Sequence, residues 1–360
     1  MGTALADGAH LAAAPRAGLI AERLCAQLLS GRPARTAVDV AERLLAVQAQ
    51  DARGVRLAVR ARTRGLSVAD FDRALTEERS LVINWLNRGT LHLVRSEDHA
   101  WLHSLAAPGL ARAGERRLEQ EGVSRAAADR AVAAIERALG EEGPLTRAQL
   151  GERVAALGVR TEGQALIHIL FAACVRGVAV RGPMIARQHA YALARDWLGV
   201  QKLPERDVAL GELARRYLAG HGPAGERDLA RWAGLPLRDA RAGLARVGRE
   251  LRVRRDGLLA LAGRRAARSM PRPRLLGAFD PLLLGWCSRE EILGEQQARV
   301  VLGGMFRPFA LVGGRGVATW RVDGGRVVLE PFGRLAGGDC AALEEDGRDA
   351  LRYLALEREA

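Results

Sequence analysis

Lysine is almost absent from this chain of 360 residues: of 55 Lys and Arg side chains, only Lys202 is a lysine. A Schiff-base mechanism needs a side-chain amine as its nucleophile. Lys202 lies in a polar connector outside the motifs described below. The composition therefore argues against an enzyme that works through a lysine adduct.

Cysteines and long apolar runs are also scarce. The four cysteines are widely scattered, without a Cys-x-x-Cys pair or a histidine at ligand spacing, so we expect no disulfide framework, metal site or cofactor. No run approaches the roughly 18 apolar residues of a membrane-spanning helix. The Ala/Gly-rich start, residues 1–17, has no apolar segment of secretory type. These features predict a cytoplasmic protein with a disordered N-terminus.

Positive charge is in excess. Lys and Arg outnumber Asp and Glu by 55 to 42, which gives a net charge of +13. Such a balance favours a polyanionic partner, and nucleic acid is the first to consider. Hydrophobic residues make up 48% of the chain and aromatic residues 4%, so the cores must consist mainly of Leu, Val and Ala.

A helix-stop pattern occurs twice, at Gly143-Pro144 and at Gly222-Pro223. In both places a helix precedes the Gly-Pro pair, and residues that can cap the next helix follow it. A further helix and short alternating stretches come next, and Asp256-Gly257 between two such stretches is a strong hairpin signal. Three helices followed by a two-stranded ribbon is the winged-helix arrangement. We expect a third, more diverged copy in the N-terminal part, with its turn at Arg88-Gly89.

These patterns predict an α+β fold of tandem winged-helix units followed by a small antiparallel, β-barrel-like domain. We expect winged-helix units over residues 18–106, 107–200 and 201–268. Short strands separated by glycine turns then predict a β-rich domain over residues 269–360, which ends in a helix from about Cys340 to Leu356. Trp85 and Trp320 lie within predicted strands, where a tryptophan is usually part of the core.

Gln48-Ala49-Gln50 places amides where the apolar pattern asks for a hydrophobic residue. Residues 38–47 have the period of an amphipathic helix, and continuing that period puts Gln48 on the inward face. Burying an amide without partners costs on the order of 1–3 kcal/mol, so Gln48 is either hydrogen-bonded structure or part of a reactive site. Both amides can face one side only in an extended or turning chain. We therefore expect the helix to end near Val47 and Asp51 to cap the next helix.

Four arginines follow the glutamine pair at spacings of three, four and four residues: Arg53, Arg56, Arg60 and Arg64. On a helix they form one basic stripe, with Val55 and Val59 turned toward the core. Such a stripe is either a solvated face or a DNA-binding surface. Phosphate contacts would make its affinity for DNA steeply dependent on salt.

Other candidate DNA contacts lie on the predicted hairpins: Arg88, His92, Arg252, Arg254 and Arg255. For His92 the alternative is a half-buried side chain whose hydrogen bonds are satisfied within the protein. Asp280 and Arg289 are expected to form a structural ion pair across the Asp-Pro turn.

Several stretches, in this order and spacing, resemble one known family. They are Gln48-Ala49-Gln50; Arg88-Gly89-Thr90-Leu91-His92-Leu93-Val94; His221-Gly222-Pro223 with Asp228 and Trp232; Phe279-Asp280-Pro281-Leu282-Leu283-Leu284-Gly285 with Arg289; and Gly316-Val317-Ala318-Thr319-Trp320. From about Gly18 to Gly333 the chain resembles the bacterial winged-helix DNA-binding-domain family that includes the AlkZ-type and YcaQ-type DNA glycosylases. The resemblance implies three winged-helix units and a β-rich domain wrapped around duplex DNA.

In that family a Gln-x-Gln or Gln-x-Asp motif is the catalytic element, and Gln48 and Gln50 match the Gln-x-Gln form of the AlkZ-type branch. Members of that branch remove bulky N7-alkylpurine lesions, including interstrand crosslinks left by genotoxic natural products, and some protect the producing bacteria. The resemblance thus implies a glycosylase that acts on double-stranded DNA carrying alkylated purines.

Two glutamines suffice for such a reaction because N7 alkylation gives the base a positive charge and so activates the leaving group. The protein then needs only to hold a water near C1′ and to present negative dipoles to the sugar cation. We expect Gln50 to fix the water and Gln48 to orient it and stabilise the cation. The scarcity of lysine predicts a monofunctional enzyme without lyase activity, and tandem modules favour a monomer.

Two other functions fit the charge and the repeats. A non-catalytic winged-helix regulator would bind a specific DNA sequence, and a sequestering resistance protein would hold the drug or the damaged DNA without cutting it. The regulator gives no reason for a Gln-x-Gln motif beside an arginine stripe, and the sequestering protein predicts tight binding to lesion DNA with no released base.

Overall fold

The computed structural model describes residues 10–185, 188–263 and 270–355. Helix α1 (His10–Ala26) begins the described part of the chain. Of the expected disordered N-terminus, residues 1–9 lie outside the described residues, and residues 10–17 are helical instead. The alanine-rich composition of this segment also favours a helix.

The first unit contains helices α2 (Ala37–Leu44), α3 (Ala52–Arg60) and α4 (Val68–Thr76), and strands β1 (Val47–Gln48), β2 (Leu81–Trp85) and β3 (Leu91–Arg95). Capping boxes begin two of these helices, Thr36 with Asp39 at α2 and Ser67 with Asp70 at α4. A single 3-10 turn, η1 (Asn87–Gly89), joins β2 to β3.

Two further units repeat the order of three helices and a hairpin. Helix α5 (Ser96–Gln120) leads to the second unit: α6 (Arg125–Glu142), α7 (Arg147–Ala155), α8 (Ala165–Val175), β4 (Ala179–Ile185) and β5 (Gln188–Leu193). Helix α9 (Ala194–Leu198) leads to the third: α10 (Arg206–His221), α11 (Glu226–Ala233), α12 (Leu237–Arg246), η2 (Gly248–Glu250), β6 (Leu251–Val253) and β7 (Leu259–Leu261). The predicted helix ends before both Gly-Pro pairs and the hairpin around Asp256-Gly257 are confirmed.

In each unit an extended segment between the first two helices pairs with the hairpin. In the first unit this segment is β1, whose Gln48 pairs with His92 of β3. In the other units it is a single antiparallel bridge, between Leu145 and Tyr191 and between Ala224 and Leu259. Gln48 therefore lies where the chain between two helices meets the hairpin of its own unit.

The first and second units share one sheet. Their hairpins join through Ile83 and Arg181 into a five-stranded sheet in the order β1-β3-β2-β4-β5. A continuous hydrophobic core runs through both units and includes Trp85, as expected. The two units are thus fused by a sheet and a core, although the sequence suggested separate modules.

The C-terminal part is an open sheet covered by a helix. Strands β8 (Arg274–Leu276), β11 (Phe309–Val312), β12 (Arg315–Asp323) and β13 (Arg326–Pro331) lie in the order β13-β12-β11-β8. The edge strands β13 and β8 do not pair, so the predicted barrel-like closure is wrong; four strands are too few to close around a packed interior. Helix α15 (Gly337–Tyr353) packs on the sheet through Leu343 and Ala350, and Trp320 is in this core.

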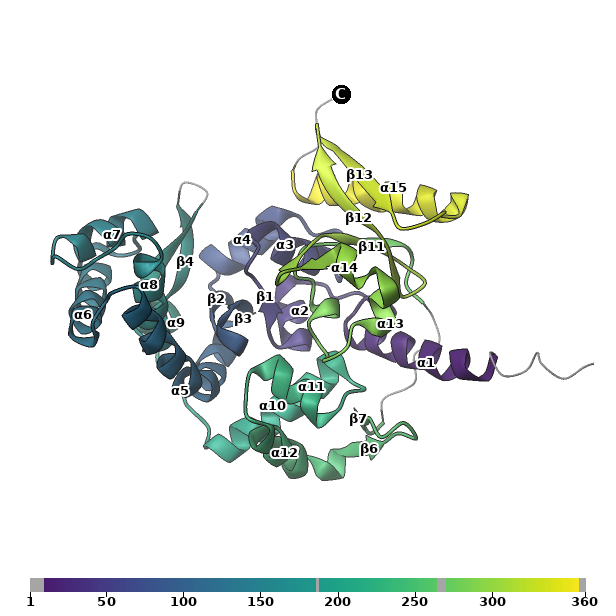
Figure 1. Ribbon diagram of the computed structural model, residues 1–360, viewed down its shortest axis with the longest axis horizontal. Helices are drawn as coiled ribbons and strands as arrows, with labels where there is room; N and C mark the ends of the chain where they lie inside the picture. Colours follow the sequence, from purple (N-terminus) through teal and green to yellow (C-terminus); the bar gives the residue numbers. More distant parts are fainter. Residues whose placement is uncertain (1–9, 186–187, 264–269, 356–360) are drawn as a thin grey trace, which may run out of the picture.

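Between β8 and β11 the chain forms short elements: η3 (Pro281–Leu283), α13 (Glu290–Leu293), η4 (Gly294–Gln296), α14 (Gln297–Val300), β9 (Val301–Leu302) and β10 (Met305–Phe306). A second core joins them to α1, α5 and the third unit. Figure 1 shows the second unit and the C-terminal sheet on opposite sides of the first unit, with α10–α12 below it. Among the described residues, no helix has both the length and the apolar character needed to cross a membrane.

Candidate active site around the glutamine pair

A tight turn at Leu45 connects α2 to β1. Helix α2 ends at Leu44, earlier than the predicted end near Val47, because Leu45 adopts φ 64° and ψ −48°. The N–H of Ala46 then donates to the carbonyl of Leu44 over 2.8 Å. A γ-turn of this hand is rare for a non-glycine residue and is strained. It directs the following residues along the hairpin instead of continuing the helix.

Gln48 is buried, with 7% of its surface exposed, and its amide is oriented by Arg88. The Nη2 of Arg88 donates to the Gln48 Oε1 over 3.1 Å. Because a guanidinium has only donors, the Gln48 atom that faces it must be the carbonyl oxygen. A carbonyl oxygen has two lone pairs, so Oε1 can accept a second hydrogen bond, for example from a water.

Gln50 is exposed and is oriented by the backbone of the same hairpin. The N–H of Leu91 donates to the Gln50 Oε1 over 3.3 Å, and the N–H of the intervening Ala49 donates to the carbonyl of Leu91 over 2.7 Å. The prediction that the pair lies in an extended or turning segment is confirmed, since Gln48 is in β1 and Gln50 is in the bend that follows. One amide is buried and the other faces solvent.

Asp51 caps helix α3, as predicted, by accepting a hydrogen bond from the N–H of Gly54. Gly54 also packs closely against the backbone of the C-terminal part. A Cβ at this position would lie 2.3 Å from the carbonyl oxygen of Ala278, so only glycine fits here. The start of α3 is therefore fixed on both sides, immediately after the glutamine pair.

Arg88 connects the first hairpin to the third unit. Its guanidinium also donates to the carbonyl of Trp232 at the end of α11. The α11 C-cap glycine, Gly234, approaches so closely that a Cβ there would lie 2.7 Å from the Arg88 backbone N. Burial, and then repulsion from Arg231 and Arg289, lowers the pKa of Arg88 to about 10. Arg88 thus stays charged at neutral pH.

His92 is buried, with 1% of its surface exposed, and its ring Nδ1 lies 3.0 Å from the carbonyl oxygen of Thr90. Burial, and then the charge of Arg88, lowers the pKa of His92 to about 3. His92 is therefore neutral near pH 7. The structure places it in the protein interior, where it supports β1, and not on a surface that DNA could contact.

The basic stripe on α3 is not a continuous exposed surface. Arg56 is 8% exposed and pairs with Asp72 over 2.5 Å. Arg60 is 5% exposed and pairs with Asp346 of α15 over 2.7 Å. The expected stripe is therefore wrong for these two, which hold α3 to α4 and to α15, whereas Arg53 and Arg64 are exposed and stay candidates for DNA contacts.

On the third hairpin, two of the three candidate arginines have acidic partners. Arg252 pairs with Glu22 of α1 over 3.2 Å. Arg254 pairs with Glu22 and with Asp256. Arg255 is exposed and is the most accessible of the three.

The expected Asp280–Arg289 pair does not form. Asp280 pairs instead with Arg62 over 2.8 Å, and both side chains are completely buried. Gln27 of α1 accepts from the same guanidinium over 2.8 Å. Arg289 donates through Nε to the carbonyl of Leu283 over 2.7 Å and lies over the ring of Phe306. Sequence analysis missed Arg62 because its partner is 218 residues away.

Sequence analysis missed Arg231 and assigned Arg289 only a structural role, although after burial both charges contribute to the lowered pKa of Arg88. Arg231 is an exposed residue of α11, and Arg289 is the residue before α13. The signal in the sequence is that Arg231 precedes the motif residue Trp232 and that Arg289 is itself a motif residue. Among the described residues, no group of three His, Cys, Asp or Glu side chains could hold a metal ion.

A protein-family model described as "DNA glycosylase AlkZ-like" matches residues 41–353. The chain belongs to the AlkZ-like DNA glycosylase family. A curated relative from Streptomyces sahachiroi, named "Interstrand DNA cross-link repair glycosylase", is 26% identical, and the alignment covers 94% of this chain and 96% of the relative.

The solved structure of Streptomyces sahachiroi DNA glycosylase AlkZ is similar in fold, with a TM-score of 0.75 and 27% identity. The similarity covers 95% of this chain and 97% of that one. The AlkZ-like match includes both glutamines and also Arg88, Arg231 and Arg289. The resemblance seen in the sequence is therefore confirmed at the level of the family and of the whole fold.

Proposed function

We propose that this AlkZ-like protein is a monofunctional DNA glycosylase that hydrolyses the N-glycosidic bond of cationic N7-alkylpurines, with Gln48 and Gln50 as its catalytic residues. The observation that carries the proposal is the orientation of the pair. Two carboxamide oxygens are held by donors of one hairpin, at Arg88 and at Leu91. A purely structural glutamine pair would not need one member to be exposed.

The chemistry matches what carboxamides can do. As the C1′–N9 bond breaks, its electron pair moves to the purine and neutralises the charge that alkylation placed there. The oxygen of a water bonds to C1′, and the water loses a proton to solvent, which leaves an abasic site. Carbonyl dipoles aimed at this centre hold the water and stabilise the sugar cation in the transition state. We assign the water to the exposed Gln50, and its orientation and the cation to Gln48.

We also infer that the three helix-and-hairpin units are winged-helix units that bind duplex DNA as a monomer. The order of helices and hairpins and the net charge of +13 support this interpretation. Arg53, Arg64 and Arg255 are the exposed members of the predicted contact set. Arg56 and Arg60 are not proposed as DNA contacts, because both are buried and paired with aspartates of the protein.

Bulky and crosslinking adducts are the proposed substrates, and repair or self-resistance is the proposed role. The crosslink-repair name of the relative from Streptomyces sahachiroi supports this extension. The exposure of Gln50 agrees with it, because a large adduct need not be enclosed in a pocket to reach an exposed side chain.

Base release from two duplexes tests the proposal, one with a single N7-alkylguanine and one with an N7–N7 interstrand crosslink. We expect the wild type to free the alkylated base from both and to leave heat-labile abasic sites. Tight binding without release would favour a sequestering protein, and footprinting of one undamaged sequence would favour a regulator.

Lyase activity is tested with borohydride, which traps a Schiff base between an amine and an abasic site. We expect no covalent enzyme–DNA adduct, because Lys202 is the only lysine of the chain. A trapped adduct that disappears in Lys202→Arg would contradict the monofunctional mechanism.

A further inference from the structure

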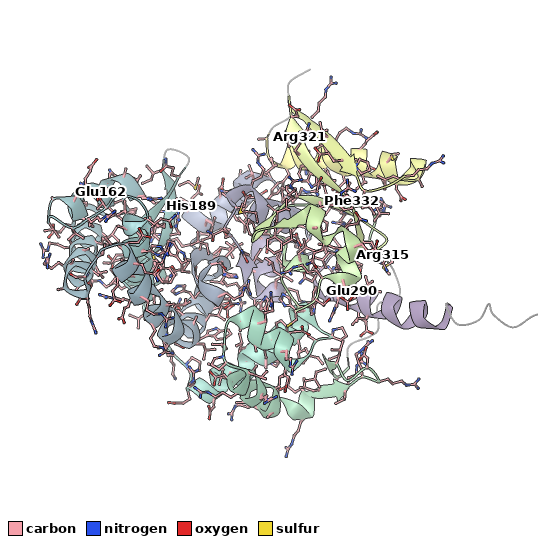
Figure 2. The ribbon with its side chains drawn as sticks, viewed as in Figure 1. Glu162, His189, Glu290, Arg315, Arg321 and Phe332 are labelled. Carbon is pink, nitrogen blue, oxygen red and sulfur yellow. The ribbon has the colours of Figure 1, made fainter. Side chains whose placement is uncertain are left out.

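Three arginines from three parts of the chain gather around Arg88, whose guanidinium contacts Gln48. Arg88 belongs to the turn of the first hairpin, Arg231 to α11 of the third unit, and Arg289 precedes α13 of the C-terminal part. Figure 2 labels Glu290, the residue after Arg289, on the side of the C-terminal part that faces the third unit. We call these three residues the arginine cluster.

Hydrogen bonds fix the frame that holds the cluster. Arg88 donates to the carbonyl of Trp232, the residue that follows Arg231. The C-terminal part is tied to α11 by the N–H of Cys287, which donates to Asp228 over 2.8 Å. Arg289 is anchored by its bond to the carbonyl of Leu283. The guanidinium groups of Arg88 and Arg289 are therefore held by carbonyl oxygens, and Arg231 is placed by its position in α11, one residue before Trp232.

The cluster has no internal counterion among the residues that the structure describes. None of its members forms an ion pair with a carboxylate, whereas neighbouring arginines such as Arg23 and Arg241 do. The charges also repel each other, and repulsion by Arg231 adds to burial in lowering the pKa of Arg289 and of Arg88. Three cations held together without an acid are a ready site for an anion.

We propose that Arg88, Arg231 and Arg289 bind one phosphodiester of the DNA backbone within one nucleotide of the lesion; this inference rests on the glycosylase function proposed above. Arg88 touches Gln48 over 3.1 Å, so the anion lies next to the reacting nucleotide. A DNA strand offers a phosphate about every 3.4 Å along the helix axis. Guanidinium forks match the geometry of phosphate oxygens and bind them with paired hydrogen bonds.

The bound phosphate has an electrostatic consequence for the reaction. Unneutralised arginines next to Gln48 would oppose the positive charge that develops on the sugar. A phosphate in the cluster cancels part of that field, and it also places C1′ against the two carboxamides. The cluster therefore couples correct placement of the strand to the electrostatic conditions that cleavage needs.

Single methylphosphonate substitutions in the lesion strand test the site, because each replaces one charged phosphate by a neutral group. Binding is measured for the wild type, Arg231→Gln and Arg289→Gln on duplexes with the neutral linkage at each position around an N7-alkylguanine. We expect one linkage within one nucleotide of the lesion to weaken wild-type binding about tenfold. The same linkage should weaken the binding of either variant less than that of the wild type, by no more than about fourfold, because one of the three cations that contact this phosphate is already absent.

Salt dependence gives an independent measurement. Loss of one phosphate contact should lower the slope of log affinity against log salt by about 0.9. Arg137→Gln, an exposed arginine of α6 with the same charge change, is the matched control and should show no coupling to any linkage near the lesion.

The inference would be overturned if the neutral linkage near the lesion weakened the binding of Arg231→Gln and Arg289→Gln as much as that of the wild type. It would also be overturned if the variants responded differently from the wild type only at linkages far from the lesion. These outcomes are distinct from failure of the proposed function. Binding and coupling are measured without cleavage, whereas a wild type that binds but releases no base would contradict the glycosylase assignment alone.

Discussion

Gln48 and Gln50 differ in burial but share one constraint, namely that their carbonyl oxygens face donors that cannot act as acceptors. Arg88 offers only N–H groups to Gln48, and Leu91 offers its backbone N–H to Gln50. Neither amide titrates, and the histidine that pairs with Gln48 across the sheet, His92, has a pKa lowered to about 3 by burial. The site therefore contains oriented acceptors whose charge state does not change near neutral pH.

A flat pH profile of the chemical step is the first prediction at this scale. Single-turnover excision of an N7-alkylguanine should vary less than about threefold between about pH 6.5 and 8.5, since no catalytic group titrates there. The step is measured with enzyme in excess and on a fully bound duplex. A bell-shaped or sigmoidal profile with a tenfold amplitude would show that a titrating acid or base takes part.

Unlike the excision rate, the stability of the protein should depend on pH. The pKa of buried His92 and of buried His99 is lowered to about 3, and burial is the main cause in both cases. The unfolded chain takes up protons on these residues below about pH 6.5, whereas the folded chain does not. The free energy of unfolding should therefore fall as the pH drops from 6.5 toward 3, measured by urea unfolding. His92→Gln should reduce this dependence.

The buried Arg62–Asp280 pair should be essential for stability. Arg62→Met leaves Asp280 charged in the interior, which costs about 3–5 kcal/mol of unfolding free energy for a buried pair that loses one partner. Arg64→Met, at an exposed arginine two residues further on, should change stability by no more than about 0.5 kcal/mol. Equal and small effects in the two variants would show that the pair is not needed.

At the scale of elements, the contact between α11 and the first hairpin positions Arg88. Gly234 ends α11 with φ +70°, and a Cβ there would also meet the Arg88 backbone. Gly158 has a similar φ of +68° but has open space around it. Comparing alanine substitutions at these two glycines separates two costs in unfolding free energy. One is the cost of a left-handed conformation in a non-glycine residue, and the other is the cost of displacing the first hairpin.

Gly158→Ala should therefore lose only the conformational part, about 1–2 kcal/mol, and keep wild-type excision. Gly234→Ala should lose more stability and at least tenfold in the excision rate, because the turn with Arg88 must shift. Denaturant unfolding and single-turnover excision measure the two effects. If both variants behaved alike, the position of Arg88 would not depend on this contact.

Local sequence patterns predicted elements well and contacts between distant elements poorly. Hydrophobic period, Gly-Pro pairs and Asp256-Gly257 located the helices and hairpins, and the resemblance located Gln48 and Gln50. The hydrophobic period could not show that the helix would end at Leu44 and that Leu45 would form a tight turn. The acidic partners of Arg60 and Arg62 are far along the chain, in α15 and at Asp280. Arg60 of the predicted stripe is therefore buried by a segment that no local pattern connects to it.

At the scale of the whole molecule, the units share cores. One core joins the first two units, and another joins α1, the third unit and the C-terminal segment. The candidate active site lies where the first unit meets the third unit, because Arg88 contacts both Gln48 and Trp232, so its geometry depends on both being folded. The arginine cluster can exist only in such an assembly.

A single cooperative unfolding transition is the prediction that follows. Urea unfolding followed by far-UV circular dichroism should coincide with unfolding followed by tryptophan fluorescence, which reports on Trp85 in one core and on Trp232 and Trp286 in the other. Two separated transitions would show that the units fold independently and that the shared cores contribute little.

The central claim is that two oriented carboxamides perform the cleavage, and single-turnover excision of an N7-alkylguanine duplex tests it most directly. The variants are Gln48→Ala and Gln50→Ala, with Gln164→Ala, an exposed amide of the second unit, as control. We predict that each site variant loses about 10²-fold or more in rate, as when a preorganised polar group is removed, while it binds the duplex within about twofold of the wild type. The control should keep the wild-type rate. Wild-type excision by both site variants at full binding would contradict the claim.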